Sequence, residues 1–214
     1  MATADQRNNA QDEIEIRRVR GLWAYARDLG ELDVMMTCFH PDATVAVSWF
    51  AGPAKEFLAG TKTLLGRLKP QERSKHAIGN WRCEIKGDRA ILESEVTLNA
   101  RDLIEGVLYD YTGFMRFHDQ FERRAGIWRI AKWVAIYDMD RMAPVIPGSA
   151  PAGFFDPVKF DGPDNSVAFM RLRQAKLGRT MPPGLVIGGS KAEAELKESG
   201  REWLAEGAGR RAAE

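Results

Sequence analysis

The stretch SKHAIGNWRCEIKGDRAILESEV, residues 74–96, decides the fold class of this chain. Apolar and polar residues alternate on both sides of Gly87-Asp88, and such a pair between two alternating runs is typical of a β-hairpin. Two further alternating runs follow, joined by a compact turn signal at residues 123–126. We therefore predict four consecutive antiparallel strands, over residues 76–86, 89–101, 107–122 and 127–137.

Helices precede these strands. Apolar residues recur at spacings of three and four over residues 14–29, which predicts an amphipathic helix that ends at Gly30. A strand is expected at residues 43–50, with a short helix before it and another helix after it, within residues 52–69. Helices followed by an antiparallel meander indicate an α+β domain.

The character of the chain changes after Asp140. Residues 141–157 are rich in Pro, Gly and Ala, which favours an extended arm lying over the surface. Two helix-like segments follow, around residues 166–177 and 191–205. We expect residues 146–214 to form a C-terminal extension that packs on the domain or on a partner subunit.

The composition excludes several classes of protein. The 214 residues are 44% apolar and 29% charged, with a formal net charge of +1, which is typical of a globular protein and argues against a dedicated nucleic-acid binder. No apolar run approaches the roughly 20 residues of a membrane span, and the polar N-terminus does not resemble a signal peptide, so a cytoplasmic location is expected. Two cysteines and three histidines without ligand spacing predict neither a disulfide framework nor a metal site, and no cofactor is expected.

His76 is the leading candidate for chemistry because imidazole can take and return a proton near neutral pH. On the predicted strand it shares a face with Ile78 and Asn80; the alternative is a histidine hydrogen-bonded at a strand end. Asp28 lies three residues after Tyr25, so both are expected on one helix face. Asp28 could orient His76 or act as the base, or it could be a solvated carboxylate in the last helical turn.

Other polar residues are weaker candidates. The Tyr25 phenol could donate a hydrogen bond to a substrate oxygen, or it could pack in the core. Arg101 ends a predicted strand and could hold a phenolate, enolate or carboxylate, unless it forms a solvated pair with Asp102. Asp110 is a second-choice carboxylate. The remaining histidines, at positions 40 and 118, are interpreted as surface or turn residues outside the site.

The predicted strands are rich in aromatic residues. Most of these should form the core, and some are expected to form the walls of a slot for a flat, aromatic ligand. The candidate substrate-binding residues are Trp49, Asn80, Tyr109, Tyr111 and Trp133.

Three segments resemble the SnoaL-like branch of the NTF2-like superfamily. They are residues 19–45 (VRGLWAYARDLGELDVMMTCFHPDATV), 74–90 (SKHAIGNWRCEIKGDRA) and 122–141 (ERRAGIWRIAKWVAIYDMDR). The resemblance implies a cone in which helices enclose an apolar pocket against a curved antiparallel sheet. It covers residues 12–145 and leaves the C-terminal extension outside.

The resemblance also implies site residues. In dehydratases of this superfamily, a tyrosine and an aspartate of the first helix face a strand histidine across the pocket. The tyrosine matches Tyr25 and the histidine matches His76, whereas the aspartate falls at Gly30. The chain departs from the pattern at this position, and Asp28 is the nearest replacement.

These observations together predict a cofactor-independent lyase. It would act on a hydrophobic aromatic alcohol or diol, by dehydration or by retro-aldol-like loss of formaldehyde, as from lignin-derived diarylpropanes. His76 and a carboxylate would move the proton, and Tyr25 or Arg101 would stabilise negative charge. The alternatives are a non-catalytic binding or association module, or an isomerase or cyclase. A homo-oligomer, dimer or trimer, is expected because members of the superfamily commonly bury the open face of the sheet.

Overall fold

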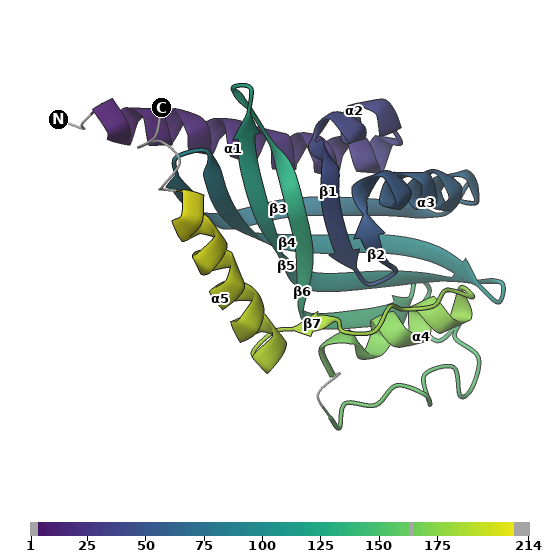
Figure 1. The fold of residues 1–214 in the computed structure, drawn as a ribbon. Coiled ribbons are helices and arrows are strands. Elements are labelled where there is room, and N and C mark those ends of the chain that lie inside the picture. Colours follow the sequence, from purple (N-terminus) through teal and green to yellow (C-terminus); the bar gives the residue numbers. More distant parts are fainter. Residues whose placement is uncertain (1–3, 163–164, 208–214) are drawn as a thin grey trace.

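The computed structural model describes residues 4–162 and 165–207 (Figure 1). One mixed sheet has the strand order β2-β1-β6-β5-β4-β3, and a further short strand, β7, pairs with β6. The strands are β1 (Phe39–Val47), β2 (Phe50–Pro53), β3 (Arg73–Lys86), β4 (Arg89–Ile104), β5 (Val107–Arg124), β6 (Ile127–Pro144) and β7 (Val186–Ile187). The helices are α1 (Ala4–Leu29), α2 (Leu32–Thr37), α3 (Ala54–Gly66), the 3-10 turn η1 (Asn165–Val167), α4 (Ala168–Lys176) and α5 (Lys191–Glu206).

The four-stranded meander predicted from the sequence is present as β3 to β6, and the α+β class is confirmed. The turns at Glu105-Gly106 and Ala125-Gly126 have positive φ at both central residues, as tight hairpins with right-handed strand twist require. The strand predicted at residues 43–50 has other bounds in the structure. Strand β1 already begins at Phe39 and ends at Val47, after which the chain turns into β2. Both β1 and β7 run parallel to β6, and β7 pairs with β6 directly beyond the end of β1.

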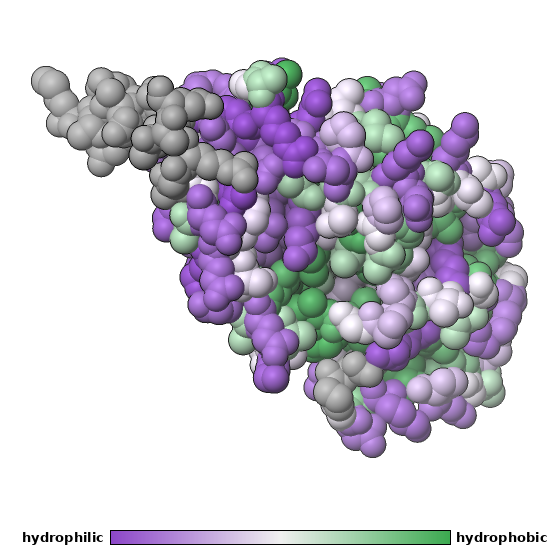
Figure 2. All heavy atoms as spheres, viewed as in Figure 1, coloured by the Kyte–Doolittle hydropathy of each residue, from purple (hydrophilic) through white to green (hydrophobic). Residues whose placement is uncertain are grey.

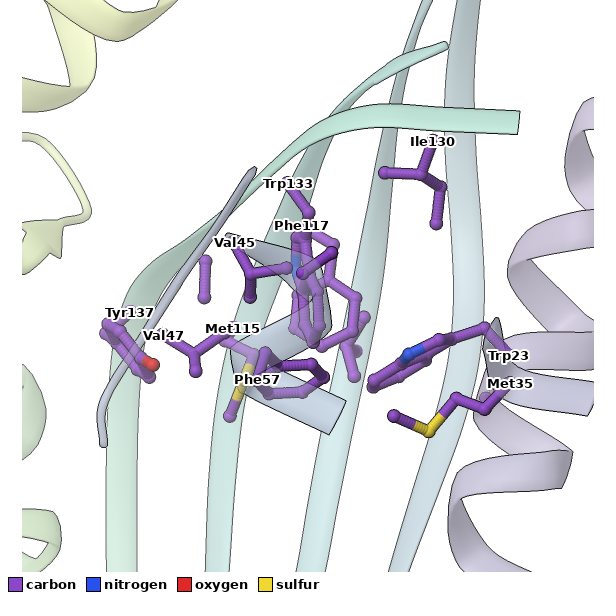
Figure 3. Packing of buried hydrophobic residues seen from close by; sticks show 14 of the residues in the cluster. Trp23, Met35, Val45, Val47, Phe57, Met115, Phe117, Ile130, Trp133 and Tyr137 are labelled. Atoms are coloured by element: carbon purple, nitrogen blue, oxygen red, sulfur yellow. The ribbon is translucent and has the colours of Figure 1, made fainter. Parts of the chain in front are cut away.

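Aromatic side chains join the N-terminal helices to the sheet. Figure 3 shows Trp23 from α1 and Phe57 from α3 pointing toward Phe117 and Trp133 of the sheet. The ring centroid of Trp133 lies 4.5 Å from that of Trp23, 4.7 Å from that of Phe117 and 5.4 Å from that of Phe57. These edge-to-face contacts form one wall of the hollow between the helices and the sheet.

A buried ion pair holds α1 on the sheet. Arg20 of α1 and Asp119 of β5 are both 0% exposed. The guanidinium donates through Nε to Asp119 Oδ2 over 2.8 Å and through Nη2 to Oδ1. Its central carbon also lies 4.8–4.9 Å from the ring centroids of Trp23, Phe117 and Trp133. The pair therefore sets the position of α1 along β5.

The described part of the C-terminal extension packs on the same domain. The expected surface arm is partly buried, since Phe154 is 4% exposed and stacks on Tyr109 with a centroid distance of 4.3 Å. The N-cap residue of α4, Val167, offers no side-chain acceptor. Asp140 of β6 takes that role, accepting hydrogen bonds from the backbone N–H of Met170 (2.6 Å) and Phe169 (3.3 Å).

Helix α5 covers part of the opposite face of the sheet. Leu196 packs on Val134 and Ile136 of β6, and Figure 2 shows apolar side chains between the hydrophilic outside of α5 and the neighbouring strands. Arg116 of β5 joins the helix through an ion pair with Glu193. None of the described helices combines the length and the apolar character needed to cross a membrane.

We expect Asp119→Asn to lower the free energy of unfolding by about 3–5 kcal/mol, because it leaves the buried Arg20 uncompensated. Asp110→Asn is the matched control, since Asp110 makes the same bidentate contact with Arg101 over 2.7 Å at side chains that are 49% and 44% exposed. The control should cost less than about 1 kcal/mol. Urea unfolding measures both, and equal losses would contradict the role assigned to the buried pair.

We also expect the stability of the protein to depend on pH through Asp140, because burial raises the pKa of this carboxyl to about 6. Its pKa in the folded protein exceeds that in the unfolded chain, so stability falls as pH rises from about 4 to 6. Asp140→Asn keeps the cap and removes the charge. As pH rises from 4 to 7, the free energy of unfolding of this variant should increase relative to that of the parent protein by no more than about 2 kcal/mol. Chemical unfolding at several pH values measures this difference. A difference that does not change with pH would refute this assignment.

Candidate functional site

A cavity lies between α1, α3, α4 and the inner face of the sheet. The cavity has a volume of about 90 Å³, which is space for several water molecules or a compact ligand. Its apolar walls are Trp23, Val47, Trp49, Phe57, Leu64, Leu65, Leu68, Leu98, Ala100, Met115, Phe117, Trp133, Ala135 and Met170. Its polar lining is Arg27, Ser48, Arg73, Ser74, His76, Asp102, Tyr137, Arg173, Gln174 and Arg179.

A histidine–carboxylate pair borders the cavity. His76 lies near the start of β3, and Asp28 lies in the last turn of α1. His76 Nδ1 is 2.7 Å from Asp28 Oδ1, and the backbone N–H of His76 donates to Oδ2 over 2.7 Å. Their side chains are 11% and 6% exposed. With the carboxylate as acceptor, Nδ1 carries the proton of the neutral ring, which leaves Nε2 as the basic nitrogen.

The surroundings keep this imidazole neutral at pH 7. Burial lowers the pKa of His76 below its ordinary value of 6.5, and the positive charges of Arg27 and Arg20 act in the same direction. The hydrogen bond and charge of Asp28 oppose the shift. Trp23 packs edge-on against the ring, with a centroid distance of 5.4 Å. The arrangement provides an oriented base in an environment of low polarity.

The structure corrects the match of the first helix. Tyr25 is 67% exposed, so the expectation that it faces the pocket is wrong. Residues two apart on a helix differ by about 200°, which places Tyr25 opposite the inward-facing Trp23. Trp23 and Asp28, five residues apart like Tyr25 and Gly30, are the aromatic residue and the carboxylate that α1 presents to His76, and Trp23 has no hydroxyl to offer. Gly30, with φ of 76°, ends the helix.

Arg101 does not belong to this site. It pairs with Asp110 on the outer face of the sheet, so neither residue can serve the cavity. Successive residues of a strand point to opposite faces, and β4 directs Asp102 inward. Asp102 is buried and accepts two hydrogen bonds from Arg173 of α4, over 2.6 and 2.9 Å. The expected solvated pair of Arg101 and Asp102 is therefore wrong.

Two of the five candidate substrate-binding residues, Trp49 and Trp133, line the cavity. Tyr109 and Tyr111 are buried outside it, the first against Phe154 and the second beneath the guanidinium of Arg173, 5.2 Å from the ring centroid. Asn80 donates to Glu95 on the outer face (3.1 Å), because an irregularity between Ile78 and Trp81 changes the alternation of β3.

The remaining histidines lie away from the cavity. His40 contacts the carbonyl oxygen of Glu122 through Nε2, 2.9 Å away. His40 and His118 are 4% and 3% exposed and lie in strands, so the expectation that they are surface or turn residues is wrong for both. Helix α5 covers His118, and a Cβ atom built on Gly200 would lie 2.9 Å from the Nε2 of this histidine.

Sequence reasoning missed the arginines of the cavity. Arg27 lies one turn after Trp23 on α1, a spacing that could have placed it on the inner face. Arg173, Gln174 and Arg179 come from the C-terminal extension. No local pattern connects that segment to residues 23–76, so only the folded chain shows that it contributes to the site.

Residues 8–134 match the model of the SnoaL-like domain. The chain belongs to this family. Pea pathogenicity protein 2 of Fusarium vanettenii is 30% identical to it over 161 residues, which are 68% of this chain and 64% of that protein. A protein of Emericella nidulans, AN9274, is 29% identical over 158 residues, which are 68% of this chain and 65% of that protein. The chain thus spans slightly less than two thirds of these SnoaL-like relatives.

Solved structures share the fold at low sequence identity. A candidate scytalone dehydratase from Novosphingobium aromaticivorans aligns with a TM-score of 0.55 and 15% identity, over 67% of this chain and 97% of that one. A type 2 LinA, a hexachlorocyclohexane dehydrochlorinase, aligns with a TM-score of 0.52 and 15% identity, over 68% of this chain and 97% of that one. These likenesses support the NTF2-like cone.

We expect the imidazole of His76 to titrate below pH 6.5 in NMR spectra of its ring nitrogens. Asp28→Asn should lower this pKa further, because it removes the charge that favours the protonated ring. His40 is the internal control, since burial lowers its pKa without any contribution from Asp28. A His76 pKa at or above 6.5, or one that rises in Asp28→Asn, would contradict the electrostatic account.

Proposed function

We propose that this SnoaL-like protein is a cofactor-independent lyase in which His76, oriented by Asp28, removes a proton from a compact, hydrophobic substrate. The observation that carries the proposal is the 2.7 Å contact between His76 Nδ1 and Asp28 at the wall of an apolar cavity. A scaffold has no need of a buried imidazole whose second nitrogen is kept basic. Perturbed, paired titratable groups in a cavity favour a catalytic site.

The proposed reaction is an elimination. His76 Nε2 takes a proton from the carbon next to the one that bears the leaving group, and the C–H electron pair forms the new double bond. Asp28 stabilises the imidazolium that forms. A hydroxyl departs with its bonding electrons and leaves as water when it receives the proton from this imidazolium, which restores the neutral base.

The comparisons support this reaction class. A dehydratase and a dehydrochlorinase both perform eliminations, and the two names occur among proteins that share the fold. The edge-on rings of Trp23, Phe117 and Trp133 form an aromatic wall that suits a flat ring, so we infer an aromatic alcohol as the substrate class. From a 1,3-diol, the same base could instead remove the proton of one hydroxyl, so that the C–C bond breaks and releases formaldehyde. The electron pair of that bond then forms a double bond, and the other hydroxyl leaves as water with the proton from His76.

The test is turnover of aromatic alcohols and 1,3-diols by the purified protein, with loss of water or formaldehyde as the readout. His76→Gln should lower kcat by about 10²–10⁴-fold, as expected for the loss of a general base. Tyr25→Phe is the control, because the exposed phenol lies outside the cavity, and it should keep the parent activity. Retained turnover in His76→Gln would refute the base assignment, and binding without turnover of any such substrate would favour a binding module.

The pH dependence gives a second readout of the same site. Because the neutral imidazole is the active form and burial lowers its pKa, kcat/KM should stay high at pH 7 and fall on the acid side with an apparent pKa below 6.5. A profile in which activity increases as pH falls through this range would be inconsistent with a His76 base.

A further inference from the structure

The cavity is chemically divided. His76 lies among apolar walls, whereas four arginines contribute to the remaining lining, with Asp102 as the one carboxylate among the described lining residues. Three of these arginines, Arg27, Arg173 and Arg179, lie within electrostatic reach of one another. Such a concentration of positive charge in a small apolar space is expected to attract an anion.

Only part of this charge is neutralised by the protein. Arg173 forms its bidentate pair with Asp102, and Arg73 donates to the backbone oxygen of Glu72 over 2.6 Å. Within residues 4–162 and 165–207, the guanidinium groups of Arg27 and Arg179 have neither a hydrogen bond nor an ion pair. Nη1 of Arg27 is fully buried in this state.

Leaving these groups unpaired is costly. A buried guanidinium without a partner loses the hydration of its N–H donors and gains no hydrogen bond in return. Burial lowers the pKa of both Arg27 and Arg179, and the positive charge of Arg173 acts in the same direction on both. The charge of Asp28 opposes this shift at Arg27, and the charges of Asp102 and Glu72 oppose it at Arg179. A bound anion would supply the missing acceptors and offset the repulsion.

We propose that Arg27 and Arg179 bind a carboxylate group of the substrate and thereby hold its reacting carbon near His76. The inference rests on the proposed function, since it narrows the substrate class of that site to a compact aromatic alcohol that also carries a carboxylate. A planar carboxylate matches the forked donors of a guanidinium. A dianion costs more to remove from water into a cavity with apolar walls than a monoanion does, which favours a carboxylate over a phosphate.

The C-terminal extension supplies half of this pair. Arg179 lies shortly after α4, and the SnoaL-like match ends at residue 134. Arg27 comes from α1, directly before the Asp28 that orients His76. One arginine of the proposed carboxylate site therefore belongs to the SnoaL-like domain, and the other belongs to a segment outside the matched residues.

Calorimetric titration of the full-length protein with cinnamate and with cinnamamide tests the inference, because the two probes share a ring and differ in charge. Cinnamate should bind at least tenfold more tightly than cinnamamide. Arg27→Gln and Arg179→Gln should each remove this preference and leave the affinity for cinnamamide unchanged. Arg101→Gln, which changes an exposed arginine on the outer face, should keep it.

Other outcomes are equally decisive. The carboxylate assignment would be overturned if the parent protein bound the two probes with equal affinity, or if it bound neither benzoate nor cinnamate at millimolar concentration. It would also be overturned if phenyl phosphate bound more tightly than cinnamate. Unfolding curves of each variant show whether it is folded, and Arg179→Gln remains informative if Arg27→Gln is not.

A His76→Gln variant separates this inference from the proposed function. It should bind cinnamate with parent affinity, because Arg27 and Arg179 are intact, while turnover is lost. If His76→Gln abolishes turnover but the arginine variants bind cinnamate normally, the carboxylate inference fails and the lyase proposal stands. If the arginine variants lose cinnamate and His76→Gln turns substrate over normally, the carboxylate site stands and the base assignment fails.

Discussion

The buried ion pair of Arg20 and Asp119 is the constraint on which the site depends. It joins the middle of α1 to the middle of β5 at a point with no solvent to weaken the interaction. A helix is nearly rigid over two turns, so the position of Arg20 also sets that of Asp28. Asp28 then meets His76, which β3 presents from the sheet. The geometry of the pair thus follows from an ion pair that takes no part in the chemistry.

The cavity concentrates polar groups that the protein itself leaves unpartnered. Buried polar atoms in proteins are nearly always hydrogen-bonded. Among the described residues that line the cavity, Trp23 Nε1, Trp133 Nε1, Arg27 Nη1 and Gln174 Oε1 are buried without a partner. Departures of this kind are expected at functional sites, where a ligand completes the hydrogen bonds.

The C-terminal extension is an integral part of this architecture. Strand β7 continues the edge of β6 beyond β1, and Asp140 caps α4 in the absence of a capping residue of its own. These contacts carry Arg173, Gln174 and Arg179 to the cavity. The family domain therefore provides the histidine and its carboxylate, and the extension contributes much of the polar lining that faces them.

The sequence by itself determined the elements, because strand alternation, helical spacing and turn residues are local patterns. They predicted β3 to β6 and the end of α1 at Gly30, whereas His76 and Asp28 became candidates through their side-chain chemistry and the resemblance to the family. Only the tertiary structure decided which side chains meet. It turned Tyr25 and Arg101 outward, moved Asn80 away through an irregularity in β3, and brought Arg179 to the same cavity as Arg27. These outcomes depend on register and on packing between distant segments, which local periodicity does not encode.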